Sequence, residues 1–467
     1  MLLERIEDEA LAQYSYIVGD SNAAEVAVID PRRDIEVYLD WATKHGARIA
    51  AVLETHIHAD FASGARALAA HSGATLHVSA HDRGETFEVA HPHHDLAHGE
   101  RVAVGDVALE AVHTPGHTPE HLSFLVFERD SQQPAAMLSG DFLFVESVGR
   151  PDLLGDEEST ALAGQLFDSV QGLSAYPDSL PVHPGHGAGS MCGAGMGESA
   201  TTTLGRERER NPYLAPGLSR EAFVQQVLEN APPFPPYYRR MKRVNSDGPP
   251  LLDQGAEPAA LDAHDFHRKV QDGHVVIDLR DQTAYGASHV PDAFGIGAEK
   301  LSMWAAWVVP YDTPLLLVGD DDAIAEAARA LTRVGLDDVR GWLRGGMTAW
   351  IAAGLPVSDI PQISPEGLHR RLEAGDGTQV LDVRTDDEWA DGHVPGALHI
   401  MGGYLPDRID EVPRDRPVVM MCGSGYRSTI AASVLERAGV EDVTNLTGGM
   451  KAWQDAGLDT TRSRKET

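Results

Sequence analysis

Cysteine is nearly absent from this sequence, which has two cysteines in 467 residues. Two thiols cannot form the disulfide framework of a small secreted domain, and such low cysteine use is typical of a reducing compartment. The sequence also has no run of about 18 apolar residues, the length that a membrane-spanning helix needs. Its first twenty residues carry acidic side chains early and lack a long apolar stretch. We therefore expect no membrane span, no signal peptide and a cytoplasmic location.

Basic residues are also scarce, since 38 Lys and Arg face 71 Asp and Glu, for a formal net charge of −33. A nucleic-acid groove or a surface that binds anionic membranes needs positive potential. We therefore expect neither nucleic acid nor membrane as a partner, and an anionic substrate would need a local positive pocket. The length of the chain predicts about three domains.

A proline-rich stretch divides the chain. Residues 231–250, APPFPPYYRRMKRVNSDGPP, contain six prolines. Proline disfavours regular structure, so this span is expected to be a linker or an extended wrap. Before it, short apolar runs alternate with turn signals and a few helical stretches, which predicts a β-rich sandwich that carries helices.

An internal repeat organises the rest of the chain. VVIDLRDQTAYGASHVPDAFGI (275–296) matches VLDVRTDDEWADGHVPGALHI (380–400), and GGMTAW (345–350) matches GGMKAW (448–453). Each copy also has an apolar strand followed by a helical stretch. Alternating strands and helices predict two α/β domains, each with a parallel sheet and helices on both faces.

The second copy carries a candidate nucleophile in VVMMCGSGYRS, where Cys422 ends a buried strand. The backbone amides of residues 423–427, the start of the following helix and the charge of Arg427 all favour a thiolate there. A buried structural cysteine is the alternative. The first copy has no cysteine in the matching loop, VGDDDAIA, and its acidic side chains would repel an anionic donor. We expect that copy to be inert and to pack against or position the active one.

The LDVR, GHVPGALHI, CGSGYRS and GGMKAW segments together resemble the rhodanese family of sulfurtransferases. The resemblance implies that Cys422 carries a sulfane sulfur as a persulfide and that Arg427 helps to hold the anion. It also implies a cradle for the substrate formed by Gly423, Ser424, Gly425, Tyr426 and Ser428. Related phosphatases have one more residue between Cys and Arg, so the tighter loop of this chain suits sulfur rather than phosphate.

Four motifs in the N-terminal block place metal-ligand residue types beside glycine or proline. They are THIHAD with His56, His58 and Asp60, HTPGHTPEH with His117, LSGDFLF with Asp141, and VHPGHGAGSMCG with His183 and His186. Their order and spacing resemble the metallo-β-lactamase superfamily, which implies two β-sheets packed between helices, an αββα sandwich. One metal site of that pattern would be His56, His58, His117 and Asp141. The other would be Asp60, residue 61, His186 and the shared Asp141, but Phe61 stands here and removes a nitrogen ligand.

A single metal changes the expected chemistry. Two histidines and one carboxylate with open positions suit Fe(II) and oxygen, and the persulfide dioxygenase branch of this superfamily is built that way. The resemblance implies one Fe(II) per chain on His56, His117 and Asp141, with zinc as the alternative metal. His58, Asp60 and His186 would then orient ligands and substrate, or form an alternative metal site. The similar segment SVGRPDL makes Arg150 a candidate contact for an acidic thiol substrate. Cys192 is either close to the iron site or a packed small residue.

We therefore expect three domains. Residues 1–245 would form a metallo-β-lactamase-fold dioxygenase domain with a C-terminal linker, 258–357 an inert rhodanese-like domain, and 362–460 an active rhodanese domain. The combination resembles persulfide dioxygenase–rhodanese fusions. It implies oxidation of a small thiol persulfide by O₂ to sulfite and thiol, with Cys422 interconverting persulfide plus sulfite and thiosulfate plus thiol. We expect a homo-oligomer, either a dimer or a tetramer.

Two alternatives stay open. One is a zinc thioester hydrolase of the glyoxalase II type with a sulfur-carrying appendage. The other is a non-enzymatic sulfur relay or redox sensor that docks a partner through the inert repeat.

Overall fold

The computed structural model describes residues 1–20, 24–129, 131–252 and 257–462. The chain divides into two compact units, Met1–Gln254 with Thr332–Gly335, and Gly255–Leu331 with Leu336–Thr467. Among the described residues, no helix is long and apolar enough to cross a membrane.

Two mixed six-stranded sheets form the first unit. The first sheet has the order β1 (Leu2–Asp8), β2 (Gln13–Gly19), β3 (Glu25–Ile29), β4 (Arg48–Leu53), β5 (Thr75–Ser79), β6 (His94–Leu96). The second has the order β14 (Thr202–Thr203), β13 (Pro181–Pro184), β10 (Ala136–Gly140), β9 (Leu122–Glu128), β8 (Val107–His113), β7 (Arg101–Val104). The two strands β11 (Leu143–Phe144) and β12 (Ser147–Val148) pair as a separate hairpin.

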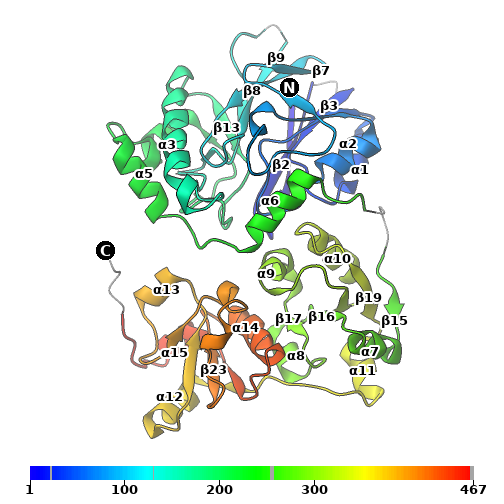
Figure 1. Ribbon diagram of the computed structural model, residues 1–467, viewed down its shortest axis with the longest axis vertical. Helices are drawn as coiled ribbons and strands as arrows, with labels where there is room; N and C mark the ends of the chain where they lie inside the picture. Colours follow the sequence, from blue (N-terminus) through cyan, green and yellow to red (C-terminus); the bar gives the residue numbers. More distant parts are fainter. Residues whose placement is uncertain (21–23, 130, 253–256, 463–467) are drawn as a thin grey trace. The chain divides into compact units, whose positions relative to one another are not determined.

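Alternating side chains of the strands build the layers of this unit. On β2, Tyr16 and Val18 join the core between the sheets, where Phe124 of the second sheet also lies. Ile17, which points to the opposite face, packs with α1 (Glu36–His45) and α2 (Ala65–Ser72). The outer face of the second sheet packs with α3 (Asp156–Gly172) and α5 (Arg220–Glu229), so helices flank the two sheets on both sides (Figure 1). The predicted αββα sandwich is confirmed. The shorter helices of this unit are α4 (Leu204–Arg210), η1 (Ala80–Asp82), η2 (Leu173–Ala175) and η3 (Pro212–Leu214).

The expectation that residues 231–250 form irregular structure is wrong in its central part. Helix α6 spans Tyr237–Asp247. The prolines lie before its first residue and after its last one, where they interrupt no helical hydrogen bond. The span therefore contributes a helix to the first unit.

Two five-stranded parallel sheets with the same strand order form the second unit, which confirms the predicted repeat. The first copy has the order β15 (Ala260–Leu261), β19 (Val339–Leu343), β18 (Leu315–Val318), β16 (Val275–Asp278), β17 (Phe294–Gly295). Its helices are α7 (Ala263–Gln271), α8 (Gln282–Ala287), η4 (Ala298–Lys300), α9 (Leu301–Val308), α10 (Ile324–Thr332) and α11 (Gly346–Ala352).

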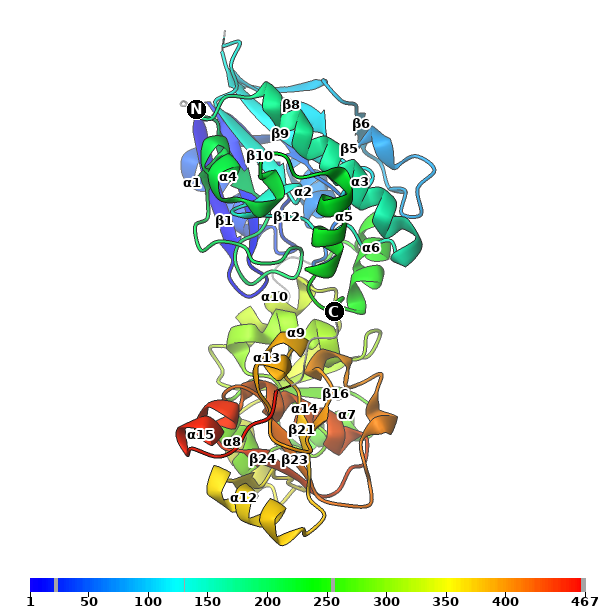
Figure 2. The same ribbon diagram turned by 90° about the vertical axis from the view of Figure 1, so that its left-hand side faces the viewer.

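The second copy has the order β20 (Gln362–Ile363), β24 (Val443–Leu446), β23 (Val418–Met421), β21 (Gln379–Asp382), β22 (Leu398–His399). Its helices are α12 (Pro365–Ala374), α13 (Asp386–Asp391), η5 (Gly402–Tyr404), η6 (Ile409–Glu411), α14 (Tyr426–Arg437) and α15 (Gly449–Asp455), several of which are visible around the sheet in Figure 2. The two copies agree in detail. The Nε of Arg280 donates to Asp278 at 2.9 Å, and Arg384 makes the same bond to Asp382 at 2.9 Å.

Candidate metal centre and sulfur-transfer loop

The predicted metal ligands lie where strands of the first unit end. His56 follows β4, Asp141 follows β10 directly, and His186 follows β13, whereas His117 lies on the loop between β8 and β9. Loops held by strand ends position side chains rigidly, which a metal site requires. The structure thus brings together residues that are far apart in the sequence.

His56, His117 and Asp141 form a compact set whose side chains are completely buried. The Nε2 atom of His117 is 3.5 Å from Asp141 Oδ2, and that of His56 is 3.9 Å from the same oxygen. Within the described part of the chain, neither Nε2 atom has a hydrogen-bond partner. A buried polar atom without a partner is costly, so two such nitrogens facing a carboxylate fit a cation that binds between them.

The tautomers of both histidines are fixed by their other ring nitrogen. Thr55 donates its hydroxyl hydrogen to Asp30 at 2.8 Å and therefore accepts from Nδ1 of His56 at 2.9 Å. Nδ1 of His117 donates to the carbonyl oxygen of Arg150 at 2.9 Å. Both Nε2 lone pairs are thus directed at the site, as in metal-binding histidines held by outer hydrogen bonds. Burial also lowers the pKa of His56 and of His117 well below the ordinary value, which keeps both rings neutral.

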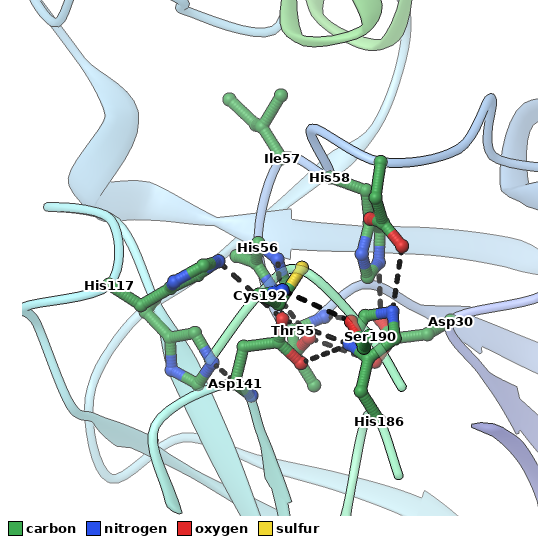
Figure 3. A network of polar contacts seen from close by, with 12 residues as sticks. Asp30, Thr55, His56, Ile57, His58, His117, Asp141, His186, Ser190 and Cys192 are labelled. Atoms are coloured by element: carbon green, nitrogen blue, oxygen red, sulfur yellow. Dashed lines mark hydrogen bonds and ion pairs between the residues drawn. The ribbon is translucent and has the colours of Figure 1, made fainter. Parts of the chain in front are cut away.

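His58 lies next to His56 but binds other carboxylates than Asp141 (Figure 3). Its Nε2 atom is 3.1 Å from Glu54 Oε2 and 3.2 Å from Asp30 Oδ1. Burial lowers the pKa of His58, but the two carboxylates outweigh burial and raise it well above the ordinary value. The buried ring of Phe61 packs against the imidazole with centroids 4.4 Å apart. Nε2 of His58 is thus bound to Glu54 and Asp30, whereas its Nδ1 atom is buried without a hydrogen-bond partner in the described part of the chain.

Asp60 and His186 pair with each other beside the same set. The Nε2 atom of His186 is 2.7 Å from Asp60 Oδ2, and its Nδ1 atom is 2.8 Å from Asp141 Oδ1. Burial lowers the pKa of His186, but Asp141 and Asp60 raise it to about 10. The buried thiol of Cys192 lies beside this pair: one ligand atom from each of the three residues falls within 4.8 Å of the others. Cys192 is thus close to the metal centre, one of the two positions that the sequence leaves open.

Two glycines allow the backbone to approach Asp141. A Cβ atom at Gly149 would lie 1.9 Å from the carbonyl oxygen of Asp141 and 3.0 Å from Nδ1 of His117. A Cβ atom at Gly185 would lie 2.5 Å from Oδ1 of Asp141. Both contacts are impossible for a side chain, so these positions require glycine for the carboxylate to keep its place.

Cys422 lies at the end of β23, in a loop whose groups converge on its sulfur. The amide of Gly425 donates to Sγ at 3.1 Å and the hydroxyl of Ser428 at 3.4 Å. Gly425 has φ of 109°, a conformation that favours glycine. The amide of Met450 donates to the Cys422 carbonyl at 2.7 Å, which explains why the GGMKAW segment accompanies the loop.

Arg427 is bound to a carboxylate across the loop. Its two terminal nitrogens donate to the two oxygens of Glu388, each at 2.7 Å. Burial raises the pKa of Glu388, but the hydrogen bond and charge of Arg427 lower it to about 2. A Cβ atom at Gly423 would lie 3.2 Å from Arg427 Nη2, so the guanidinium borders the loop. Glu388, which the sequence analysis missed, thus fixes Arg427 beside Cys422.

Family models match both parts of the chain. A rhodanese-like domain model matches residues 262–353 and 364–456, and a metallo-beta-lactamase superfamily model matches residues 8–186. A solved structure from Staphylococcus aureus, described as a metallo-beta-lactamase, is 32% identical, covers 73% of this chain and 98% of its own, and has a TM-score of 0.66.

Two curated relatives match the parts separately. A sulfurtransferase of Allochromatium vinosum is 39% identical over 21% of this chain and 92% of its own length. A hydroxyacylglutathione hydrolase of Polaromonas is 30% identical over 50% of this chain and 93% of its own length. The chain is a metallo-beta-lactamase–rhodanese fusion. The predicted family membership is confirmed for both parts.

Arg150 was predicted to contact a substrate, but its side chain is buried and binds groups of the protein itself. Its side chain is 1% exposed and binds Asp152 through Nε at 2.6 Å and Nη2 at 2.7 Å. Its Nη1 atom donates to the carbonyl oxygens of Met191 and Pro233. The guanidinium is therefore occupied within the protein, and Arg150 serves the site through its own carbonyl oxygen, which fixes His117.

Helix α6 of the fusion supports the metal-binding turn, a role that the sequence analysis missed. The Nδ2 atom of Asn245 donates to the carbonyl oxygens of His58 and Phe61, each at 2.8 Å. Its Oδ1 atom accepts from the amide of Ser63 at 2.8 Å. Lys242, which is also buried, donates to the carbonyl oxygen of Ile57 at 3.0 Å. The helical spacing of the buried positions 238, 241, 242 and 245 is the signal that was available in the sequence.

The first repeat contacts the second repeat close to the cysteine loop. The hydroxyl of Tyr426 donates to the carbonyl oxygen of Gly297 at 3.3 Å, and His289 Nε2 lies 2.8 Å from Glu436 Oε2 on α14. Both contacts reach the helix that starts at the Cys422 loop. They agree with the expectation that the first repeat packs against the second.

Proposed function

We propose that this fusion is a non-haem iron persulfide dioxygenase. We further propose that Cys422 transfers sulfur between a small thiol persulfide and sulfite. The carrying observation is the set of His56, His117 and Asp141, with two unpartnered imidazole nitrogens beside one carboxylate. His58, which would add a further nitrogen, is turned to Asp30 and Glu54. Two imidazoles and one carboxylate with open positions are the ligand set of non-haem Fe(II) oxygenases.

The proposed oxidation is RSSH + O₂ + H₂O → RSH + SO₃²⁻ + 2 H⁺. Bound iron would supply the redox chemistry that lets dioxygen react with a persulfide sulfur. The chain supplies a buried site that limits access of bulk water, and fixed histidine tautomers that need no reorganisation. Asp141 is held by His186 and by the amide-to-imidazole bond from Asp141 to His121, at 3.1 Å.

The proposed transfer has two steps at Cys422. The thiolate takes the outer sulfur of RSSH and releases RSH, which forms the Cys422 persulfide. Sulfite then attacks that outer sulfur, so thiosulfate leaves and the Cys422 thiolate returns; the reverse direction uses the same groups. The donors from Gly425 and Ser428 stabilise the sulfur anion in both states. The partners that we propose are therefore a small thiol persulfide, O₂, sulfite and thiosulfate.

Metal analysis together with oxygen uptake tests the proposal. We expect about one iron per chain, and oxygen uptake when glutathione persulfide is added. His117→Ala should abolish oxygen uptake, and Cys422→Ser should retain it while losing thiosulfate formation. Zinc at about two ions per chain, without oxygen uptake, would overturn the dioxygenase.

A second candidate is a zinc thioester hydrolase, which the intact Asp60–His186 pair and the hydroxyacylglutathione hydrolase relative favour. It predicts hydrolysis of a glutathione thioester in the absence of oxygen. A sulfur relay without catalysis predicts instead that His117→Ala has no effect on function and that Cys422→Ser removes it. The expected dimer or tetramer is checked separately by light scattering.

A further inference from the structure

Helix α6 carries the densest cluster of positive charge in a chain whose net charge is −33. Four of the five residues 239–243 are arginine or lysine, and no other five consecutive residues of the sequence have four. Arg239 and Arg243 lie one helical turn apart, and both are exposed. Within the described part of the chain, neither guanidinium forms an ion pair or a hydrogen bond. Two positive groups are therefore left for an anionic ligand, on a protein whose overall charge repels anions.

We propose that Arg239 and Arg243 form a binding site for two anionic groups of the thiol substrate, one on each side of its sulfur. The ligand class is a small thiol persulfide with a carboxylate on each side of the sulfur, as in the tripeptide γ-glutamyl-cysteinyl-glycine. The inference rests on the proposed function for the reacting sulfur, and it adds which thiol the chain accepts. It also moves to α6 the substrate contact that was expected of Arg150, whose guanidinium is bound within the protein.

Arg239 is connected to the metal set through one aromatic ring. Its Cζ atom is 5.7 Å from the ring centre of Phe234, and the Cζ atom of Arg150 is 5.2 Å from the same ring centre. The carbonyl oxygen of Arg150 accepts from Nδ1 of His117, a member of the metal set. A Cβ atom at Gly155 would lie 3.9 Å from Nη2 of Arg239, so this guanidinium also borders the loop that follows Arg150.

Arg243 is connected to the metal-binding turn in the same way, through a second ring. Its Cζ atom is 5.2 Å from the ring centre of Phe87, and Nζ of Lys242 is 5.4 Å from that centre. Lys242 donates to the carbonyl oxygen of Ile57 in the turn. Phe87 lies between η1 and β6, whereas Phe234 precedes α6. The two arginines are thus held over rings from two different segments.

The buried face of α6 is packed on the metal centre, and the arginines lie at the edge of that face. Tyr238 and Lys242, each one residue before an arginine, are buried, and the hydroxyl of Tyr238 is 3.8 Å from Cys192 Sγ. Successive residues of a helix are separated by about 100° around its axis. Each arginine is therefore beside the face that contacts the metal centre and not opposite to it.

The spacing of the two arginines suits a ligand of tripeptide length. Side chains one turn apart have Cβ atoms about 5–6 Å apart, and each guanidinium lies over a different ring. An extended tripeptide spans about 10 Å, so its two ends can reach both guanidiniums while its central sulfur lies between them. Guanidinium groups bind carboxylates through paired hydrogen bonds, which an ester cannot accept with the same strength.

S-methylglutathione is the probe, because it keeps both carboxylates but has no thiol that could bind metal or transfer sulfur. Its binding to the full-length protein is measured by isothermal titration calorimetry, beside that of its dimethyl ester, which lacks both negative charges. We expect wild type to bind the acid about 10-fold more tightly than the ester. Arg239→Gln and Arg243→Gln should each weaken binding of the acid about 3- to 10-fold, and the double variant should bind acid and ester alike.

Arg101→Gln is the matched control. Arg101 is an exposed arginine of the same unit, and its Cζ atom also lies over a phenylalanine ring, that of Phe127, at 4.4 Å. The control removes the same charge and should bind the acid within twofold of wild type. Equal binding of acid and ester by wild type, or a loss in Arg101→Gln as large as in the α6 variants, overturns the proposal. Tighter binding of S-methyl-coenzyme A, whose charges all lie on one side of the sulfur, would overturn the assignment to a thiol with an anion on each side.

Oxygen uptake with glutathione persulfide separates this proposal from the dioxygenase. The α6 variants should raise KM and leave kcat near the wild-type value, because the arginines contact the ends of the substrate and not the reacting sulfur. Selective binding of the acid without oxygen uptake would keep the site and reject the dioxygenase. Oxygen uptake with an unchanged kcat/KM in the double variant would overturn the site and leave the dioxygenase in place.

Discussion

Asn245 should control metal affinity from a helix that supplies no metal ligand. Its carboxamide makes three hydrogen bonds of 2.8 Å to the backbone of the turn that carries His56 and Asp60, and the residue is 7% exposed. Asn245→Ala leaves one buried amide and two buried carbonyl groups without these partners. A buried group that loses its partner costs about 1–3 kcal/mol, but part of this loss is recovered when the turn relaxes or admits water.

The expected decrease in metal affinity depends on how far the loss of these hydrogen bonds disorders the turn that carries His56 and Asp60. Removing the outer partners of a metal ligand typically weakens binding 10- to 100-fold, which corresponds to about 1.4–2.8 kcal/mol. Asn245→Asp should weaken binding at least as much, because a carboxylate cannot donate to the carbonyl oxygens of His58 and Phe61. Asp247→Ala is the matched control, since Asp247 is exposed on the same helix.

The assay is competition for metal against a chelator of known affinity, together with urea unfolding of the metal-free protein. We expect both Asn245 variants to bind metal at least 10-fold more weakly, and Asp247→Ala to bind within twofold of wild type. Metal affinity within twofold of wild type in both Asn245 variants would refute the reasoning, whatever their stability.

Three further predictions concern other parts of the chain. Gly149→Ala should displace Asp141 and weaken metal binding by at least 10-fold in the chelator assay, whereas Gly172→Ala, with no atom within 4 Å of the added carbon, should bind metal normally. Glu388→Gln should release Arg427 and lower kcat/KM for thiosulfate several-fold, with oxygen uptake unchanged; an unaltered value would contradict the role of the pair. Burial, and then Arg5, lower the pKa of His183 to about 4, so the folded state resists its protonation. Stability should therefore be full above about pH 6.5 and fall toward pH 4, by at most ~3 kcal/mol from this group, and urea unfolding of His183→Gln should show a smaller fall.

Much of the fold was predictable because it repeats or alternates. The two copies of the D-x-R segment keep the same ion-pair geometry, and the alternation of Tyr16, Ile17 and Val18 on β2 builds two layers at once. The ligand motifs were recognisable because strand ends, glycine and histidine occur together in short segments. These signals are local, so they survive in the sequence without knowledge of which segments meet in space.

Two expectations from the sequence differ from the structure, for two different reasons. Helix α6 was not predicted, because the six prolines of residues 231–250 suggested irregular structure for the whole span. Proline is tolerated at a helix start and after a helix end, which is where these prolines lie. Arg150 was expected to face a substrate, but its partners include the carbonyl oxygens of Met191 and Pro233, which sequence spacing cannot place. The helix could have been predicted from local spacing, whereas the contacts of Arg150 depend on segments that are distant in the sequence.

Phe61 affects both sets of candidate metal ligands, and the sequence shows only one of its two effects. The sequence indicates that Phe61 removes a nitrogen from the second site. In the structure the same ring packs on His58, whose imidazole is bound to Asp30 and Glu54. Phe61 thus removes a nitrogen from one set of the superfamily pattern and packs on a histidine of the other set. The structure thus places two imidazole nitrogens and one carboxylate oxygen together at His56, His117 and Asp141, with the buried Asp60–His186 pair bound to the same aspartate.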